Sequence, residues 1–492
     1  MNTKRQLAVV VLPVALVAGI ALVLFSQSPA QEPPKESIGE SSNAVAKIGE
    51  FVITRAELEE RLVRDIRPHE DEYPTERKPV TAENVLREML GEKAMSMEGR
   101  RLGYLTKDES LHTGIAEAEQ QRLVQMVAEN CLRERMPANQ AQVEAALKAN
   151  PKLTPDQAKG GVQRQILDQF HQELVGKFQL KTLEENFVQA ALIHQRLLLR
   201  PVEARGPNEY WIKNSQVRSE LSEKEKNLVL ATYQGGQFTL KDWFGVVCNI
   251  APPRRPSDLN TPAGVGRLLE NALWTPLFVA EAKARGYDKD QKLRSDIRQM
   301  EDQRLLYKVI EEKTKGLSEP PAEQVKAYFE KNQERFAQAA TLKVNQIWCE
   351  SLQTAQKVKA DLEGGADFEA IKKAQSLQKD EPAHNVSAVG EGLFGAELWR
   401  GETNQTVGPL RGFYNSGIKW RVVRILEKTP PKAQAYSEQV ANSVKWALME
   451  ERRQRLLEDC REELLKKYPH EIFKDRINGL DPLEIAMNKG EK

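Results

Sequence analysis

The residue types that most often carry chemistry are few and scattered in this sequence. The 492 residues include six histidines, none of them spaced i, i+4, and four cysteines without a C-x-x-C pair. Zinc sites need clustered His and Cys ligands, so this spacing predicts neither a metal site nor a cofactor. The G-x-S-x-G, H-E-x-x-H, Walker and Rossmann patterns are also missing from the sequence. We therefore expect buried free thiols at the four cysteines, which are Cys131, Cys248, Cys349 and Cys460.

The composition narrows the possible partners. Lys and Arg number 72 against 71 Asp and Glu, which gives a net charge of +1, and the mean hydropathy is −0.57. A nucleic-acid-binding protein usually carries a strong basic excess, and a polytopic membrane protein needs many apolar segments, so both classes are excluded. With 29% charged and 6% aromatic residues, the sequence favours long amphipathic helices around modest cores.

One apolar run is long enough to reach across a membrane. Lys4 and Arg5 precede a run from Leu7 to Phe25, which would span roughly 28 Å as a helix. We predict a single-pass signal anchor over residues 1–26, followed by a polar linker at 27–43, with the bulk of the chain extracytoplasmic (periplasmic). The alternative is a cleaved signal peptide and a secreted or periplasmic protein, because Ser28 and Ala30 form a small-x-small pattern.

An internal repeat organises the middle of the chain. Four blocks recur in the same order about 180 residues later. Residues 46–58 parallel 230–242, 98–104 parallel 281–287, 119–127 parallel 301–309, and 142–150 parallel 324–332. Each copy reads as a strand pair followed by amphipathic helices, so we predict two related helical modules at 44–227 and 228–337.

Two local signals mark the ends of helices within each copy. Thr54 with Glu57, and Thr239 with Asp242, have the spacing of a capping box at a helix start. Gly103 and Gly286 suit the left-handed position that follows a helix end. The first copy is expected to continue as helix from Pro155 to about Leu199.

A small α/β module is expected at residues 338–432. Residues 341–349 and 419–426 alternate as strands do, 353–362 is helical, and Asp367 is a good N-cap for a helix through Ala374. Residues 375–418 read as loop-rich. A closing helix over 436–468 lies in the last segment, 433–492. The fold class is therefore α+β and predominantly α-helical, with a transmembrane helix, two helical modules and one small α/β domain.

The order of these motifs resembles that of the SurA/PrsA-type extracytoplasmic foldases, a family of parvulin-like (PpiC-type) peptidyl-prolyl isomerases. The resemblance covers most of residues 44–470. Residues 338–432 look like the parvulin domain. The motifs that carry it are the lead-in Tyr328–Phe336, Gly365-Ala366-Asp367-Phe368 with the following Ser376, Gly408-Pro409, and Val422–Glu427.

The resemblance also implies where the family's catalytic groups would lie, and this chain departs from them. The positions of the two family histidines hold Gln346 and Arg421, so the parvulin site is degenerate and the resemblance assigns no catalytic residue. Leu393, Phe394 and Trp420 fall where the family contacts its substrate, although the segment that supplies much of the proline pocket is shortened. His384 in the loop 380–386 and Cys349 on the same strand as Gln346 are the residues that would have to compensate.

We therefore expect a membrane-anchored, extracytoplasmic folding factor that binds unfolded or client polypeptides and whose isomerase site is inactive or weak. Two alternatives remain: an active peptidyl-prolyl isomerase that uses other residues, and a non-catalytic envelope scaffold. The sequence leaves the oligomeric state open.

Overall fold

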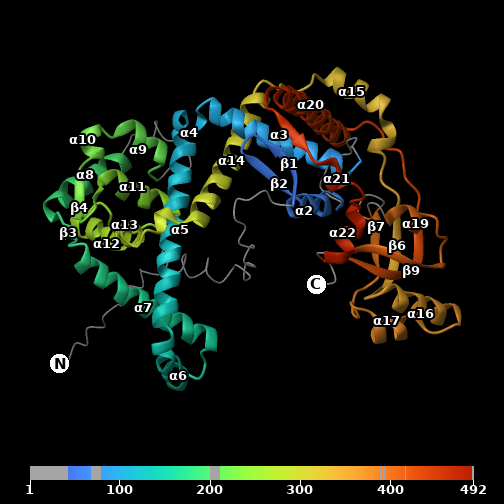
Figure 1. The fold of residues 1–492 in the computed structure, drawn as a ribbon, viewed down its shortest axis with the longest axis horizontal. Helices are drawn as coiled ribbons and strands as arrows, with labels where there is room; N and C mark the ends of the chain where they lie inside the picture. The colour runs from blue at the N-terminus through green and yellow to red at the C-terminus, as the bar shows by residue number, and fades with distance from the viewer. Residues whose placement is uncertain are drawn as a thin grey trace. The chain divides into compact units, whose positions relative to one another are not determined.

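The computed structural model describes residues 43–67, 79–199, 211–387, 391, 394–415 and 417–489. Within them the chain is mostly α-helical and carries three small antiparallel sheets (Figure 1), as the predicted α+β class requires. None of these helices is both long and apolar enough to cross a bilayer. The predicted anchor at residues 1–26 and most of the linker at 27–43 lie outside the described residues.

The contacts divide the chain into two compact units, which we describe separately. The first unit comprises residues 109–301. The second comprises the described residues between 43 and 108 together with those from 302 onward. The long helix α14 (Gln291–Thr314) contributes to both. These units cut across the two modules expected from the repeat, whose boundaries stay a prediction.

The first unit is a helical bundle with one small sheet. One hydrophobic cluster joins the helices α5, α6, α7 and α13. Another joins the helices α8, α9, α11 and α12 with the hairpin formed by β4 and β5. The elements are α5 (Glu109–Arg135), α6 (Gln140–Ala149), α7 (Pro155–Lys177), β3 (Lys181–Thr182), α8 (Phe187–Leu198), α9 (Asn214–Glu220), α10 (Glu223–Lys226), β4 (Val229–Tyr233), β5 (Gly236–Thr239), α11 (Leu240–Asn249), α12 (Pro262–Ala272) and α13 (Trp274–Ala284).

The helix expected from Pro155 to about Leu199 is present as α7 and α8, with an interruption between them. The backbone turns at Gln179, which adopts a φ of 50°, and β3 then pairs with β4. The pairing partner lies about 50 residues further along the chain, so the periodicity within 155–199 contains no sign of it.

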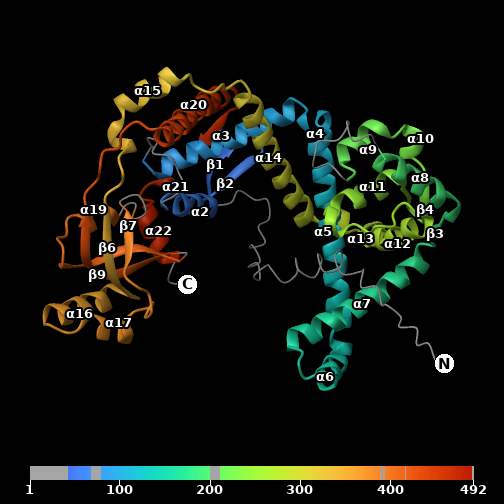
Figure 2. The same ribbon diagram turned by 180° about the vertical axis from the view of Figure 1, so that it is seen from behind.

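The second unit is built on the hairpin β1 (Ala44–Ile48) and β2 (Phe51–Thr54), with α2 (Arg55–Asp65), α3 (Ala82–Arg101) and α4 (Tyr104–Lys107) after it. The closing segments return to this hairpin: α20 (Glu438–Lys467) lies alongside α3 in both views (Figures 1 and 2), and β10 (His470–Ile472) pairs with β1. The remaining helices of this part are α15 (Ala322–Lys331), α21 (Lys474–Ile477) and α22 (Pro482–Lys489).

The two hairpins are built alike. Thr54 and Glu57 form the predicted capping box at the start of α2, and Thr239 and Asp242 form the predicted one at the start of α11. Gly103 and Gly286 each have a φ of 76°, in agreement with the left-handed position expected for them. Each hairpin gains a third strand from another part of the chain: β4–β5 takes β3, and β1–β2 takes β10.

One ion-pair arrangement occurs at matching places in the two units. In the second unit, Glu98 at the end of α3 accepts from Lys467 and from the Tyr468 hydroxyl, each at 2.7 Å. In the first unit, Glu281 near the end of α13 pairs with Lys177 at 2.5 Å. Each lysine comes from the last turn of the long helix that precedes the third strand.

The third sheet, with its helices, forms a module over residues 341–429 of the second unit. Its strand order is β7-β6-β9-β8, all antiparallel, and α16 and α17 lie against one face (Figure 1). The elements are β6 (Thr341–Cys349), α16 (Leu352–Glu363), α17 (Phe368–Gln375), β7 (His384–Ser387), α19 (Gly395–Trp399), β8 (Thr406–Tyr414) and β9 (Gly417–Thr429). The loop-rich expectation for 375–418 is corrected, because β7 and β8 lie within it.

Local chemistry explains the elements that the sequence did predict. Asp367 caps α17 by accepting from the backbone N–H of Ala370 at 2.8 Å. β6 and β9 alternate between two buried faces, and their register places Gln346 opposite Val423 and Trp348 opposite Arg421. This register brings the side chains of the candidate site to one face of the sheet.

Candidate functional site

The face of the sheet away from α16 and α17 carries the candidate site. Along β6, Ile347 and Cys349 pack against the helices, so Gln346 and Trp348 point to the other face. Arg421 on β9 lies directly across from Trp348 and shares that face. The structure thus brings the two residues at the family histidine positions together: Arg421 Nη1 donates to Gln346 Oε1 at 3.1 Å.

Arg421 is held by a buried ion pair. Its two terminal nitrogens donate to the two carboxylate oxygens of Glu391, with Nη1 at 3.3 Å from Oε1 and Nη2 on Oε2. The Arg421 side chain is 3% exposed and that of Glu391 10%. The guanidinium also lies over the Trp348 ring, 5.2 Å from its centroid. A fork-to-fork pair in such a dry place fixes the arginine in one orientation.

Gln346 extends the network to a second carboxylate. Its Nε2 donates to both oxygens of Glu381, at 3.2 and 3.3 Å. His384 Nδ1 lies 3.7 Å from Glu381 Oε1, and this contact becomes an ion pair when the imidazole is protonated. Gln346 therefore accepts from Arg421 at one end of its amide and donates to Glu381 at the other.

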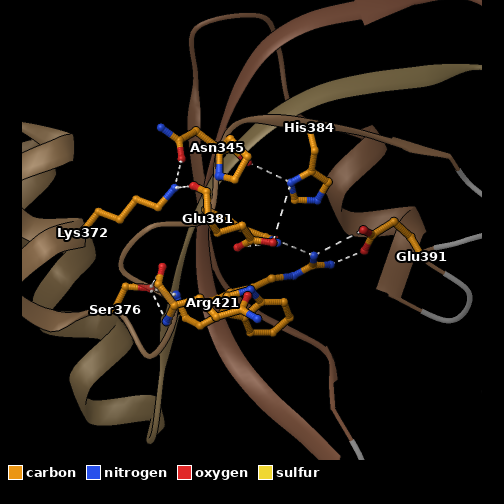
Figure 3. Close-up of polar contacts among 11 residues, drawn as sticks. Asn345, Lys372, Ser376, Glu381, His384, Glu391 and Arg421 are labelled. Carbon is orange, nitrogen blue, oxygen red and sulfur yellow. Dashed lines mark hydrogen bonds and ion pairs between the residues drawn. The ribbon is translucent and has the colours of Figure 1, made fainter. Parts of the chain in front are cut away.

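The loop that carries Glu381 is anchored by Lys372 of α17. The Lys372 side chain is buried, and its ammonium donates to Asn345 Oδ1 at 2.5 Å and to the Glu381 carbonyl (Figure 3). Asn345 in turn donates to Glu369 at 2.6 Å. These contacts fix the backbone at residue 381, so the Glu381 carboxylate is positioned before any ligand arrives.

Ser376, one of the motif residues, ties the end of α17 to β6. Its hydroxyl accepts from the backbone N–H of Trp348 at 3.1 Å and from that of Gln378 at 3.2 Å. Leu377 N–H donates to the Trp348 carbonyl at 2.9 Å. Ser376 therefore extends the edge of the sheet beside the site.

A hollow of about 570 Å³ opens beside this network. Its walls combine acidic and amide groups with aromatic rings, and Trp348 and Tyr414 touch with ring centroids 5.1 Å apart. The residues that line it are Thr341, Gln346, Trp348, Gln378, Glu381, His384, Asn385, Val386, Ser387, Glu391, Phe413, Tyr414, Asn415 and Arg421. The volume is in the range of small-ligand sites.

Of the three residues expected to contact the substrate, Trp420 and Phe394 are described by the structure, and neither lines the hollow. Trp420 neighbours Arg421 along β9, so it faces the α16 and α17 side of the sheet. Phe394 is buried against Phe413, Ile418 and α22. Leu393 lies outside the described residues, and its substrate contact stays a prediction.

The two candidate compensating residues are separated by the sheet. Cys349 is buried on the helix side, where burial raises the pKa of its thiol to about 11, so it does not reach the hollow. His384 does line the hollow. It lies in β7 rather than in a loop, where it pairs with Val344. All four cysteines are free thiols, and burial raises the pKa of each.

Sequence reasoning missed the two carboxylates that complete the site. Glu381 and Glu391 lie in connecting segments without a local motif, and only the folded sheet brings them to Gln346 and Arg421. A weak signal existed for Glu391, because it lies two residues before Leu393 and three before Phe394, which were expected to contact the substrate. Within the described ranges, no group of three or more His, Cys, Asp or Glu residues is arranged to hold a metal ion.

The geometry favours holding a ligand over assisting a reaction. The terminal nitrogens of Arg421 and the amide of Gln346 are engaged with each other and with Glu391 and Glu381, whereas Arg421 Nε has no hydrogen-bond partner among the described residues. The aromatic rings that line the hollow supply apolar contact, and the carboxylates of Glu381 and Glu391 supply charge. Such a lining suits an amphipathic ligand.

Comparisons with known proteins identify the sheet module. Residues 320–440 match the family described as the PPIC-type PPIASE domain. No curated protein matches the sequence. The similar solved structures include one from work on PEB4 and Cj1289, two SurA-like chaperones of Campylobacter jejuni. It has 14% identity and a TM-score of 0.24, and the match covers 49% of this chain and 98% of that one.

Two PrsA structures are similar at the same level. PrsA of Bacillus anthracis has 16% identity and a TM-score of 0.22, over 38% of this chain and 86% of that one. PrsA of Streptococcus pneumoniae has 14% identity and a TM-score of 0.25, over 38% and 73%.

Proposed function

We propose, from the PPIC-type PPIase domain in residues 320–440, that this chain is a folding factor that binds client polypeptides while its isomerase site is inactive or weak. It would act outside the cytoplasm, tethered by the apolar run Leu7–Phe25. The observation that carries the proposal is the engaged network of Arg421, Gln346, Glu381 and Glu391.

The chemistry of prolyl isomerisation explains why this network matters. The X–Pro bond rotates over a barrier of about 18–20 kcal/mol without any bond being made or broken. A catalyst lowers it by holding the proline ring in an apolar pocket and by giving hydrogen bonds to the twisted amide. Here the terminal nitrogens of Arg421 are used by Glu391 and Gln346, and the Gln346 amide by Arg421 and Glu381. These groups would have to leave existing partners in order to assist the amide.

Client binding has separate support in the first unit. Val188 and Leu192 of α8, with Leu199 just after it, lie on one side of the helix and are each more than half exposed. The opposite side of α8 is buried in the core. A strip of exposed apolar side chains on a stable helix is a surface on which an unfolded chain can bury its own apolar residues.

Two measurements test the proposal with the full chain in detergent. We expect it to suppress the aggregation of a chemically denatured client at a few-fold molar excess, and to leave cis–trans exchange of a short X–Pro peptide at its uncatalysed rate. Clear acceleration of exchange would instead support the active isomerase. Absence of suppression at every ratio would favour the envelope scaffold.

A variant makes the client test specific. Replacing Val188 and Leu192 by serine removes two of the three residues of the apolar strip without touching the core, so suppression should weaken. Replacing Gln189 by serine, on the same helix, is the matched control. Membrane tethering is tested by carbonate extraction: the chain should stay with the membranes, whereas a cleaved signal peptide would release it.

A further inference from the structure

We propose that the hollow beside Arg421 binds a lysine or arginine side chain of a client polypeptide, with the Glu381 carboxylate as its ion-pair partner. This inference rests on the proposed function, since it specifies which client segments the PPIC-type domain holds. It is carried by the charge balance, the exposure and the walls of the hollow.

The charges of the network do not cancel. Glu369, Glu381 and Glu391 face Lys372 and Arg421, so one negative charge remains while His384 is neutral. Arg421 is taken by Glu391 through two hydrogen bonds. Lys372 reaches Asn345 and the Glu381 carbonyl oxygen. The carboxylates of Glu369 and Glu381 therefore take their hydrogen bonds from neutral amides, those of Asn345 and Gln346, and of these two carboxylates Glu381 is the one that lines the hollow.

Glu381 is also the carboxylate that a ligand can reach. Its side chain is 22% exposed, against 10% for Glu391. Both carboxylates line the hollow, but the oxygens of Glu391 already accept hydrogen bonds from the buried Arg421 guanidinium. A cation that enters would complete the pairing of Glu381 without displacing any existing ion pair.

The walls fit the rest of a basic side chain. Trp348, Phe413 and Tyr414 line the hollow beside the carboxylates. Aromatic rings cover the methylene stem of lysine or arginine and attract the charged head. A volume of about 570 Å³ accommodates such a side chain with part of its backbone.

The site is preorganised, which lowers the entropy lost on binding. Lys372 fixes the Glu381 carbonyl, as Figure 3 shows, and Gln346 orients the carboxylate. An acidic or purely apolar segment would meet an unpaired carboxylate in the hollow and bind less well.

Binding of matched peptides tests the inference. Two fluorescein-labelled tetrapeptides, Ala-Lys-Pro-Phe and Ala-norleucine-Pro-Phe, are titrated with the full chain in detergent, and their fluorescence anisotropy is followed. The peptides differ in charge and hardly in apolar surface. We expect the lysine peptide to bind about fivefold more tightly or better, as a partly buried ion pair provides.

Variants locate the preference. Glu381→Gln keeps an acceptor for Gln346 and should abolish the preference for lysine. Glu363→Gln, at the end of α16 and paired with Lys359, is the matched control and should retain it. Equal affinity of the two peptides, no binding of the lysine peptide, or a preference that survives in Glu381→Gln would each overturn the inference.

The aggregation assay separates this inference from the proposed function. If the wild-type chain suppresses aggregation but shows no lysine preference, client binding stands and the site assignment fails. If the lysine preference is present while no client is protected, the site assignment stands and the chaperone function fails.

Discussion

Two buried histidines should make the first unit unstable in mild acid. His171 of α7 stacks on Trp274, with ring centroids 4.4 Å apart, and His194 of α8 packs between Trp243 and Phe244. One ring nitrogen of each has no hydrogen-bond partner among the described residues. Burial lowers the pKa of both imidazoles to about 4. For His194 the charge of Arg255 acts in the same direction.

The sign of the pH dependence follows from these values. An imidazole in the unfolded chain takes up a proton near pH 6.5, whereas the folded rings stay neutral down to about pH 4. Between these values the unfolded chain binds more protons, so the free energy of unfolding falls as the pH falls. Above about pH 7 the imidazoles are neutral in both the folded and the unfolded chain, so they no longer lower the free energy of unfolding.

The size of the effect follows from the same pKa difference. It corresponds to about 3 kcal/mol for each histidine. Water that reaches a charged ring through local opening reduces this, so we expect about 1.5 kcal/mol for each.

The assay compares urea unfolding of the full chain at pH 7 and pH 4.5. The His171→Gln/His194→Gln variant should lose about 3 kcal/mol less than the wild type between the two pH values. Hydrogen exchange in α7 and α8 assigns the loss to the first unit. His112→Gln, on the exposed side of α5, is the control and should keep the wild-type dependence. If the double variant loses as much stability as the wild type, the reasoning is refuted.

Four further predictions concern charged groups and the packing around them. Lys177 and Arg285 lower the pKa of Glu281 against the opposing effect of burial, so Glu281→Gln should cost about 2 kcal/mol and raise hydrogen exchange at the end of α7. Glu98→Gln should cost about 1 kcal/mol and raise exchange at the end of α20 instead, because Arg101 and Lys467 hold its pKa well below the usual range. Gly412→Ala places a methyl 2.7 Å from Arg421 Nε and 2.8 Å from the Trp348 ring, so urea unfolding should show a loss of about 1–3 kcal/mol. Arg421→Met should cost about 3 kcal/mol in the same assay by leaving Glu391 unpaired, and Arg421→Met/Glu391→Met should recover most of it; equal losses in both would contradict a buried ion pair.

Local signals predicted the elements that depend on nearby residues. The capping boxes at Thr54 and Thr239 and the cap at Asp367 involve contacts within three residues, and the structure confirms them. The strand Thr341–Cys349 is also confirmed, because its alternation is visible in the sequence although its partner strands are distant. Even Gln346 and Arg421, 75 residues apart, were placed together by the resemblance, because two paired strands carry them.

The elements that the sequence did not predict depend on distant partners. β10 is three residues long, and it becomes a strand because the edge of β1 accepts it. β8 lies in a Gly-containing stretch whose strand character comes from pairing with β9. Glu381 and Glu391 reach the site in the same way, since the sequence around them has no motif that predicts it. The ends of the helix α20 were in contrast predicted to within two residues of its observed bounds, Glu438–Lys467.

Because β10 pairs with β1, the sheet that begins at the start of the described chain is completed only when nearly the whole chain has been synthesised. Arg476 donates to the carbonyl of Ala44, 432 residues away, so the first hairpin leaves the ribosome long before its third strand is translated. The first unit is continuous from residue 109 to 301 and can fold during this interval, which shortens the flexible chain that must later be closed. Until residue 472 emerges, the edge of β1 is open to pairing with other chains. A nascent chain stalled before that point is therefore the form most exposed to aggregation.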